Sequence, residues 1–248
     1  MLFRIMPKTG EKLSVLGHGC MRLPLKGSAI DEVAAEEQIR LLIERGVNYF
    51  DTAVPYHNGA SEPFLGKVLA KDGLRRKVFI ATKLPPWQVE NRRDMDRILD
   101  TQLEKLQTDH IDYYLVHSLN RATWDKMRDL GVREFLQEAK KNGRIRWAGF
   151  SFHGTREVFP EIVDAFDWDF CQIQYNYLDE QNQAGTAGLK YAAQRNLGVI
   201  VMEPLRGGNL ATGLPPQVMK MINGFPVKRT PADWALRWIW NHPEVTVV

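Results

Sequence analysis

The sequence of 248 residues contains only two cysteines, Cys20 and Cys171, and they are far apart in the chain. Neither belongs to a C-x-x-C pair, the spacing typical of zinc sites and redox motifs. A disulfide framework needs more cysteines than this, and such low usage is typical of proteins that work in a reducing compartment. The cysteine content therefore excludes a disulfide-stabilised or zinc-ribbon domain and favours a cytoplasmic protein.

The sequence also lacks a long hydrophobic run and a strong excess of charge of one sign. No apolar stretch approaches the ~18 residues of a membrane span, and the N-terminus MLFRIMPKTG lacks the apolar core of a signal peptide. The formal net charge is only +3, and no aromatic residues are interleaved with the basic clusters. We therefore expect neither a membrane nor a nucleic-acid partner. The oligomeric state is left open.

What the sequence does contain is an alternation of short apolar segments and longer amphipathic stretches. The apolar segments are rich in β-branched and aromatic residues, as buried parallel strands are. There are eight of them: Val15–Gly19, Val47–Asp51, Val78–Lys83, Ile111–His117, Arg146–Ser151, Phe170–Tyr175, Gly198–Met202 and Val245–Val248. Helical periodicity is present in seven stretches between them: 32–45, 61–69, 91–106, 132–141, 156–166, 184–195 and 230–240.

This strict alternation predicts an α/β protein with a mainly parallel sheet. Eight strands in 248 residues is the spacing of a (β/α)8 TIM barrel. A doubly wound sheet is the rival, but it would carry G-x-G-x-x-G after its first strand, where this chain has Cys-Met-Arg-Leu-Pro. We therefore predict a single barrel domain over residues 1–248, with an N-terminal β-hairpin at Phe3–Leu13 closing its bottom and the chain ending at strand eight.

Polar residues stand at the carboxyl ends of most of the predicted strands, where TIM barrels place their chemistry. Taken singly, each has an ordinary structural explanation; Asp51, for example, would serve equally well as a helix cap or turn residue. Together, at equivalent positions of successive units, they are expected to converge on one pocket. They are Asp51, Lys83, His117, Ser151, Gln172 and Glu203.

The types of these residues indicate proton transfer. The sequence has no H-E-x-x-H or H-x-H metal motif and no G-x-S-x-G, so we expect no metal site. Tyr56 follows Asp51 by five residues. An adjacent ammonium at Lys83 would lower the pKa of the Tyr56 phenol, Asp51 would keep that ammonium charged, and His117 would polarise a carbonyl oxygen. Such a set serves an oxygen whose carbon gains or loses hydride, which a cofactor must supply.

At these residues the sequence resembles the aldo-keto reductases. The stretch Gly46–Ala53 (GVNYFDTA), with Tyr56 and then Ser61-Glu62, matches the first signature of that family. Later matches follow in order: Lys83 in ATKL, His117 in YYLVH, Ser151 in WAGFS, Gln172 in CQIQYN, and VIVMEPLRGG at 199–208. The resemblance implies a barrel enzyme that reduces aldehydes or ketones to alcohols with NADPH or NADH. It implies Asp51, Tyr56, Lys83 and His117 as the catalytic tetrad, with Tyr56 as proton donor.

The resemblance also implies a set of cofactor-binding residues. Ser151 and Gln172 match positions that hold the nicotinamide carboxamide, although Phe152 replaces a frequent asparagine. Met202 would cover the nicotinamide face, and Cys20 and Met21 would lie near its ribose. The loop after strand seven would wrap the pyrophosphate, with Arg206 as the counter-charge. The full set is Cys20, Met21, Asp51, Ser151, Gln172, Met202, Glu203, Leu205, Arg206 and Gly207.

A small carbonyl compound is the expected substrate, in a pocket shaped by loop residues beyond the strands. Aromatic walls suit an apolar carbonyl compound, although either tryptophan could equally pack beneath its own loop. The candidates are Leu23, Trp87, Leu119, Asn120 and Trp124.

Two other functions fit parts of the pattern. A cofactor-binding regulatory or sensor subunit would keep the fold with little turnover, although it has no need of Tyr56 beside Lys83. A lyase that uses Lys83 as a Schiff-base amine would leave Tyr56 and His117 without a role.

The end of the chain bears on the choice of cofactor. No eighth helix follows strand eight, and the family binds the adenosine 2′-phosphate just beyond that strand, so the sequence does not decide between NADPH and NADH. The forms VMEPLRGG and HPEVTVV are also similar to members that continue into an iron–sulfur segment. Such a cluster would belong only to a segment beyond Val248.

Overall fold

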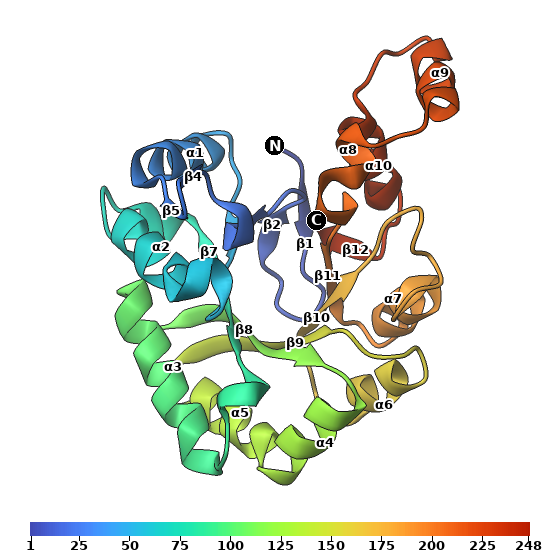
Figure 1. Cartoon of the computed structure of the whole chain (residues 1–248). Coiled ribbons are helices and arrows are strands. Elements are labelled where there is room, and N and C mark those ends of the chain that lie inside the picture. The colour runs from blue at the N-terminus through green and yellow to red at the C-terminus, as the bar shows by residue number, and fades with distance from the viewer.

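The computed structural model describes all 248 residues, and a parallel eight-stranded sheet lies at its centre (Figure 1). The strands follow one another around the sheet in sequence order, and each pair of neighbours is parallel. This confirms the predicted fold class, although the first strand is shorter than expected. The strands are β3 (His18–Gly19), β6 (Tyr49–Asp51), β7 (Phe79–Leu84), β8 (Ile111–Leu119), β9 (Ile145–Phe152), β10 (Phe170–Gln174), β11 (Gly198–Met202) and β12 (Val245–Val247).

Backbone hydrogen bonds between the first and last segments close the sheet into a barrel. The Gly17 amide donates to the Val248 carbonyl at 2.8 Å, and the Val248 amide donates to the Val15 carbonyl at 3.0 Å. The indole of Trp240 adds a third bond to the Val15 carbonyl, at 2.9 Å. The edge strands of an open sheet are thereby paired, as a barrel requires.

Seven helices occupy the positions that helical periodicity predicts, with ends that differ by at most two residues. Local capping explains several boundaries: Asn91 and Asp94 form a capping box at the start of α3, and Thr230 accepts from the Asp233 amide at the start of α10. These helices are α1 (Glu32–Glu44), α2 (Ser61–Leu69), α3 (Arg92–Leu106), α5 (Val132–Lys141), α6 (Val158–Asp164), α7 (Gly185–Gln194) and α10 (Pro231–Trp240).

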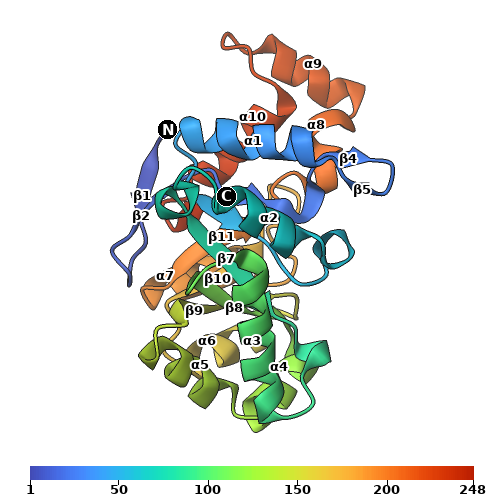
Figure 2. The same ribbon diagram turned by 90° about the vertical axis from the view of Figure 1, so that its left-hand side faces the viewer.

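Several further elements lie outside the predicted set. Helix α9 projects away from the barrel beyond α8 and α10, as both views show (Figure 1 and Figure 2). No helix in the chain is both long enough and apolar enough to cross a membrane. The additional elements are α4 (Arg121–Asp129), α8 (Asn209–Thr212), α9 (Pro216–Gly224), a ribbon of β4 (Leu25–Lys26) with β5 (Ala29–Ile30), and short 3-10 turns at Cys20–Arg22, Tyr56–Gly59, Leu74–Lys77, Pro86–Gln88 and Arg206–Gly208.

The core has two layers, one between barrel and helices and a smaller one inside the barrel. The inner layer contains Met6, Leu13, Tyr49, Ala81, Tyr113, Leu115, Phe170, Ile200 and Val247. Met6 and Leu13 belong to the antiparallel hairpin of β1 (Phe3–Ile5) and β2 (Lys12–Ser14), and both are fully buried. The predicted hairpin therefore closes the end of the barrel where the strands begin, so the opposite end, where they finish, is left for the site.

Candidate active site

Strand alternation directs Asp51, Lys83 and His117 into the open end of the barrel. Tyr49 and Ala81 point into the barrel core, and side chains two residues apart on a strand share a face. Asp51 on β6 and Lys83 on β7 therefore point inward, one step nearer the carboxyl ends. His117 on β8 follows the inward-facing Leu115 in the same way.

Lys83 is the centre of a buried polar cluster. Its side chain is 1% exposed, and its Nζ donates to Asp51 Oδ1 at 2.5 Å and to the Thr52 carbonyl at 2.9 Å. The Tyr56 hydroxyl lies 3.4 Å from the same Nζ. Tyr56 comes from the turn after β6, so β6 and β7 together bring the acid, the amine and the phenol into contact.

The pKa of Tyr56 departs from the sequence-based expectation. Burial raises this pKa above its ordinary value, and the nearby Lys83 ammonium opposes the rise without reversing it. For Lys83, burial alone would lower the pKa, but the Asp51 carboxylate and Tyr56 outweigh burial and raise it. Lys83 lowers the phenol pKa as expected, but the net shift is upward because the cost of burying a phenolate is larger. The phenol stays protonated and the amine stays charged at neutral pH.

His117 is neutral in this site. Burial, with smaller contributions from Lys83 and His153, lowers its pKa to about 3. Its Nδ1 is buried without a hydrogen-bond partner. The His117 ring lies 5.1 Å from the Trp87 ring and 6.5 Å from the Tyr56 ring, measured between centroids. A neutral imidazole with one N–H can donate a hydrogen bond to an uncharged oxygen.

Gln172 and Ser151 extend the cluster around the barrel. Gln172 on β10 follows the inward-facing Phe170 by two residues, and its Nε2 donates to Asp51 Oδ2 at 3.1 Å. Ser151 on β9 is 1% exposed, and its Oγ accepts from the Ser118 amide at 2.7 Å. Phe152 is fully buried. Its side chain has no polar group that could take the place of an asparagine beside Ser151.

The loop after β11 has an unusual backbone. Glu203, Arg206, Gly207 and Gly208 have positive φ values of 56°, 50°, 71° and 100°. Within the turn the Arg206 amide donates to the Glu203 carbonyl at 3.1 Å, and the Gly208 amide donates to the Leu205 carbonyl at 2.9 Å. Met202, half-buried at the end of β11, and Leu205 flank this turn.

Two arginines lie at this turn, and one of them was not predicted from the sequence. Arg206 is about half exposed, and its Nε is 3.4 Å from Asp179 Oδ2. Arg22 also reaches the turn, since a Cβ placed on Gly207 would lie 3.4 Å from its Nη2. Only its position directly after Met21, in a segment already expected near the cofactor, could have indicated Arg22.

Cys20 and Met21 occupy the 3-10 turn after β3. Cys20 is fully buried, and burial, together with the nearby Asp51 charge, raises the pKa of its thiol well above the usual range. The thiol is therefore an inert apolar group. Met21 is 57% exposed beside it.

The residues expected to shape a substrate pocket have different environments. Trp87 is 52% exposed next to His117, whereas Leu23 is buried and its amide donates to His57 Nε2 at 3.1 Å. Leu119 and Trp124 are buried, and Trp124 packs on Trp168 with centroids 6.2 Å apart. Asn120 caps α4 by accepting from the Thr123 amide at 3.1 Å. Trp124 therefore packs beneath its own loop, the second of the two roles that the sequence left open.

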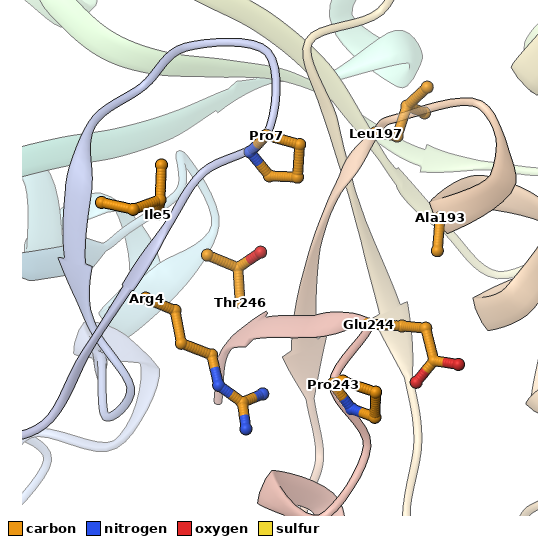
Figure 3. A pocket seen from close by; sticks show the side chains of 8 residues that line it. All are labelled: Arg4, Ile5, Pro7, Ala193, Leu197, Pro243, Glu244 and Thr246. Atoms are coloured by element: carbon orange, nitrogen blue, oxygen red, sulfur yellow. The ribbon is translucent and has the colours of Figure 1, made fainter.

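A pocket of about 360 Å³ lies at the other end of the barrel, between the N-terminal hairpin and β12 (Figure 3). None of the polar residues at the strand ends lines it. Arg4, which does, already donates to the Trp240 and His242 carbonyls, at 2.5 and 2.9 Å. This pocket is therefore separate from the polar cluster around Lys83. It is lined by Arg4, Ile5, Pro7, Ala193, Leu197, Pro243, Glu244 and Thr246.

A closed parallel barrel with a buried lysine–aspartate pair in contact with a half-buried tyrosine at its open end defines a class of barrel enzyme, and comparison with known proteins identifies the family. The profile of the aldo/keto reductase family matches residues 15–221. The chain therefore belongs to the aldo/keto reductase family and is an NAD(P)H-dependent oxidoreductase.

Individual relatives agree with this assignment. Methylglyoxal reductase YeaE of Escherichia coli is 38% identical over 226 residues, which cover 88% of this chain and 73% of that protein. L-galactose dehydrogenase of Arabidopsis thaliana is 28% identical over 224 residues, covering 86% of this chain and 68% of that protein. The holo form of aldo-keto reductase AKR11C1 from Bacillus halodurans superimposes with a TM-score of 0.83 at 27% identity, covering 100% of this chain and 85% of that one.

Proposed function

We propose that the protein reduces an aldehyde or ketone to an alcohol with NADPH, and that Tyr56 donates the proton. The observation that carries the proposal is the partly buried contact of the Tyr56 hydroxyl with Lys83 Nζ, which is itself held by Asp51. A phenol kept protonated beside a fixed positive charge, with neutral His117 facing it, is suited to protonate an oxygen that gains negative charge.

The residues present suit a nicotinamide dinucleotide. Arg22 and Arg206 bring two guanidinium groups to the left-handed turn at Arg206–Gly208. Phosphate oxygens are bound well by guanidinium groups. Gln172 and Ser151 would hold the carboxamide, while Met202 would cover the nicotinamide face. Cys20, Met21, Glu203 and Leu205 complete the proposed cofactor site, with NADH as the alternative cofactor.

When bound, the cofactor supplies hydride to the carbonyl carbon; the remaining steps belong to the side chains. His117 donates its N–H to the carbonyl oxygen and so orients the substrate. Tyr56 passes its hydroxyl proton to the same oxygen. The Lys83 ammonium stabilises the phenolate that remains, and Asp51 keeps Lys83 charged and in place. Trp87 forms an apolar wall beside the reacting group.

The site and the relatives of this chain support a small carbonyl compound as the substrate class. The exposed Trp87 gives the opening an apolar side, which suits a small carbonyl compound. One relative is a methylglyoxal reductase and another an L-galactose dehydrogenase, so simple aldehydes and sugars are the first compounds to compare.

The substitution Tyr56→Phe tests the proton donor. We expect the variant to bind NADPH as the wild type does, measured by nicotinamide fluorescence, and to lose carbonyl reduction, measured by nicotinamide absorbance. Normal turnover by Tyr56→Phe on a verified substrate would show that another group donates the proton. If the wild type binds NADPH tightly but turns over no carbonyl compound above background, the protein is a cofactor-binding module instead.

A further inference from the structure

Glu62 is a buried carboxylate that has no ion-pair partner. It is the second residue of α2 and is 1% exposed. Its Oε1 accepts from Thr82 Oγ1 at 2.6 Å and from Gln102 Nε2 at 2.8 Å, whereas Oε2 is buried without a partner. Burying a carboxylate in this way is costly, and the apolar packing of α2 does not require it. Its contact with Thr82, the residue before Lys83 on β7, indicates a role in holding that part of the strand.

Gln102 connects Glu62 to the backbone of Lys83. Gln102 lies on α3 and is 1% exposed. Its Nε2 donates both to Glu62 and to the Lys83 carbonyl, the latter at 3.0 Å, while its Oε1 accepts from the Tyr114 hydroxyl at 2.7 Å. The Lys83 carbonyl can only accept, so one orientation of the amide satisfies all of these partners.

The Lys83 carbonyl needs this partner because the neighbouring strand has already ended. The last backbone bond on the β6 side runs from the Thr52 amide to the Ala81 carbonyl, at 2.8 Å. In a parallel sheet the carbonyls of residues two apart point the same way, so that of Lys83 faces the space beyond β6. Gln102 fills the place that a strand would otherwise take.

The residue before Glu62 acts on the other end of the lysine. Ser61 Oγ donates to the Cys20 carbonyl at 3.0 Å and lies 2.8 Å from Thr52 Oγ1. The Thr52 carbonyl in turn accepts from Lys83 Nζ at 2.9 Å. The start of α2 therefore connects to both ends of Lys83, to the ammonium through Ser61 and Thr52, and to the backbone through Glu62 and Gln102.

We propose that Glu62 is a positioning residue for the proton-transfer step, because it orients Gln102 and thereby fixes the backbone from which Lys83 reaches Tyr56. This inference rests on the proposed function. The contact between Lys83 Nζ and the Tyr56 hydroxyl is 3.4 Å long, at the far limit of a hydrogen bond. A small backbone shift at Lys83 breaks it, and the phenolate then loses its stabilising charge.

The kinetic test compares Glu62→Ala with Glu62→Gln. The alanine variant removes the acceptor, so we expect kcat for carbonyl reduction to fall by about ten- to a hundredfold, as misplacement on the scale of an ångström does, while the Kd for NADPH stays unchanged. The glutamine variant keeps a carbonyl oxygen for Thr82 and Gln102 and is expected to recover most of kcat. Leu65→Ala, a cavity variant in the same helix, controls for lost stability, since it leaves kcat per folded molecule unchanged.

Two readouts separate positioning from general destabilisation. In the alcohol-oxidation direction, the pH at which the rate reaches half its maximum should rise in Glu62→Ala and not in Leu65→Ala. The Lys83 resonance of protein labelled with 13C at the lysine ε-carbon, assigned with Lys83→Arg, should shift in Glu62→Ala and return in Glu62→Gln.

The resonance is measured without turnover, so it decides the positioning role even if no substrate is reduced and the proposed function fails. A Glu62→Ala protein whose Lys83 resonance stays at the wild-type position overturns the inference. So does a loss of kcat no larger than that of Leu65→Ala.

Discussion

Lys83 and Asp51 form an ion pair that is expensive to bury. Lys83 is 1% exposed, and its partner is also buried. The free-energy cost of removing two charges from water usually exceeds what their attraction contributes. Replacing such pairs by apolar residues is therefore often stabilising. Perturbed ionisable groups gather where a protein performs chemistry. The pair therefore accords better with a role in the reaction than with one in stability.

The pKa values of Tyr56 and His117 predict the pH dependence of carbonyl reduction. Tyr56 must carry its proton, and burial raises its pKa above the ordinary value, so the rate falls only as pH rises beyond about 10. His117 has a pKa of about 3 and stays neutral. We expect kcat to show no inflection near the ordinary histidine value of about 6.5. Steady-state rates of the folded enzyme, measured at pH values on both sides of about 6.5, test this. An inflection near that value would show that a titrating histidine acts in the reaction.

The four residues proposed for catalysis could be found in the sequence because each lies at, or just beyond, the end of an apolar segment. Their supporting groups could not. Gln102 faces the barrel from α3, but in the sequence it is only one of many polar residues in an amphipathic helix. Arg22 is close to Gly207 only in three dimensions. The sign of the Tyr56 pKa shift depends on how deeply the phenol is buried. The depth of burial cannot be read from the sequence.

At the scale of elements, the contact between α2 and α3 depends on Gly66. A Cβ at this position would lie 2.4 Å from the Lys105 carbonyl oxygen, a backbone atom that cannot move away cheaply. We expect Gly66→Ala to lower the free energy of unfolding by about 3 kcal/mol, the upper part of the range for overpacked cores. Urea denaturation followed by circular dichroism measures this.

Gly224→Ala is the matched control for Gly66→Ala. Gly224, the last residue of α9, likewise has no positive φ, and a Cβ there meets nothing within 4 Å. Alanine has the higher helix propensity, so this variant should be neutral or stabilising by up to about 1 kcal/mol. If Gly66→Ala loses no more stability than Gly224→Ala, the close approach of α3 to Gly66 does not limit the side chain at this position, and the packing argument is wrong.

The eight barrel strands and seven helices could be predicted because the buried strands form short apolar segments and the burial of one face gives the helices a regular hydrophobic period. Helices α4 and α9 could not, for two different reasons. In α4 only Trp124 and Met127 are buried, too few to establish a helical stripe among charged residues. In α9 no residue is buried at all, and Met221 is 70% exposed. A helix that contacts little leaves no periodic signal.

For the whole molecule, buried neutral histidines predict sensitivity to acid. Burial lowers the pKa of His18 to about 4 and that of His117 to about 3, against about 6.5 in the unfolded chain. The unfolded state therefore binds more protons between these values. The stabilising contribution is complete above about pH 6.5 and is lost progressively as pH falls toward 4.

Urea denaturation at a series of pH values tests this sensitivity. As pH falls, the free energy of unfolding should decrease by about 1.4 kcal/mol per pH unit for each such histidine. His18→Gln should reduce the slope of this decrease by the amount that corresponds to one proton. A free energy of unfolding that stays constant between about pH 4.5 and 6.5 would show that these histidines are not buried in their neutral form.

Barrel closure also constrains the order in which the protein acquires its structure during synthesis. Arg4 donates to the carbonyl of His242, 238 positions later in the chain, and Trp240 donates to that of Val15, 225 positions earlier. The first strand therefore leaves the ribosome long before one of its two neighbours exists, and its outer edge stays unpaired until β12 is made. During that interval the nascent chain carries an unpaired sheet edge. An unpaired edge can pair with other chains and aggregate, so this is the stage at which a chaperone would protect the chain most.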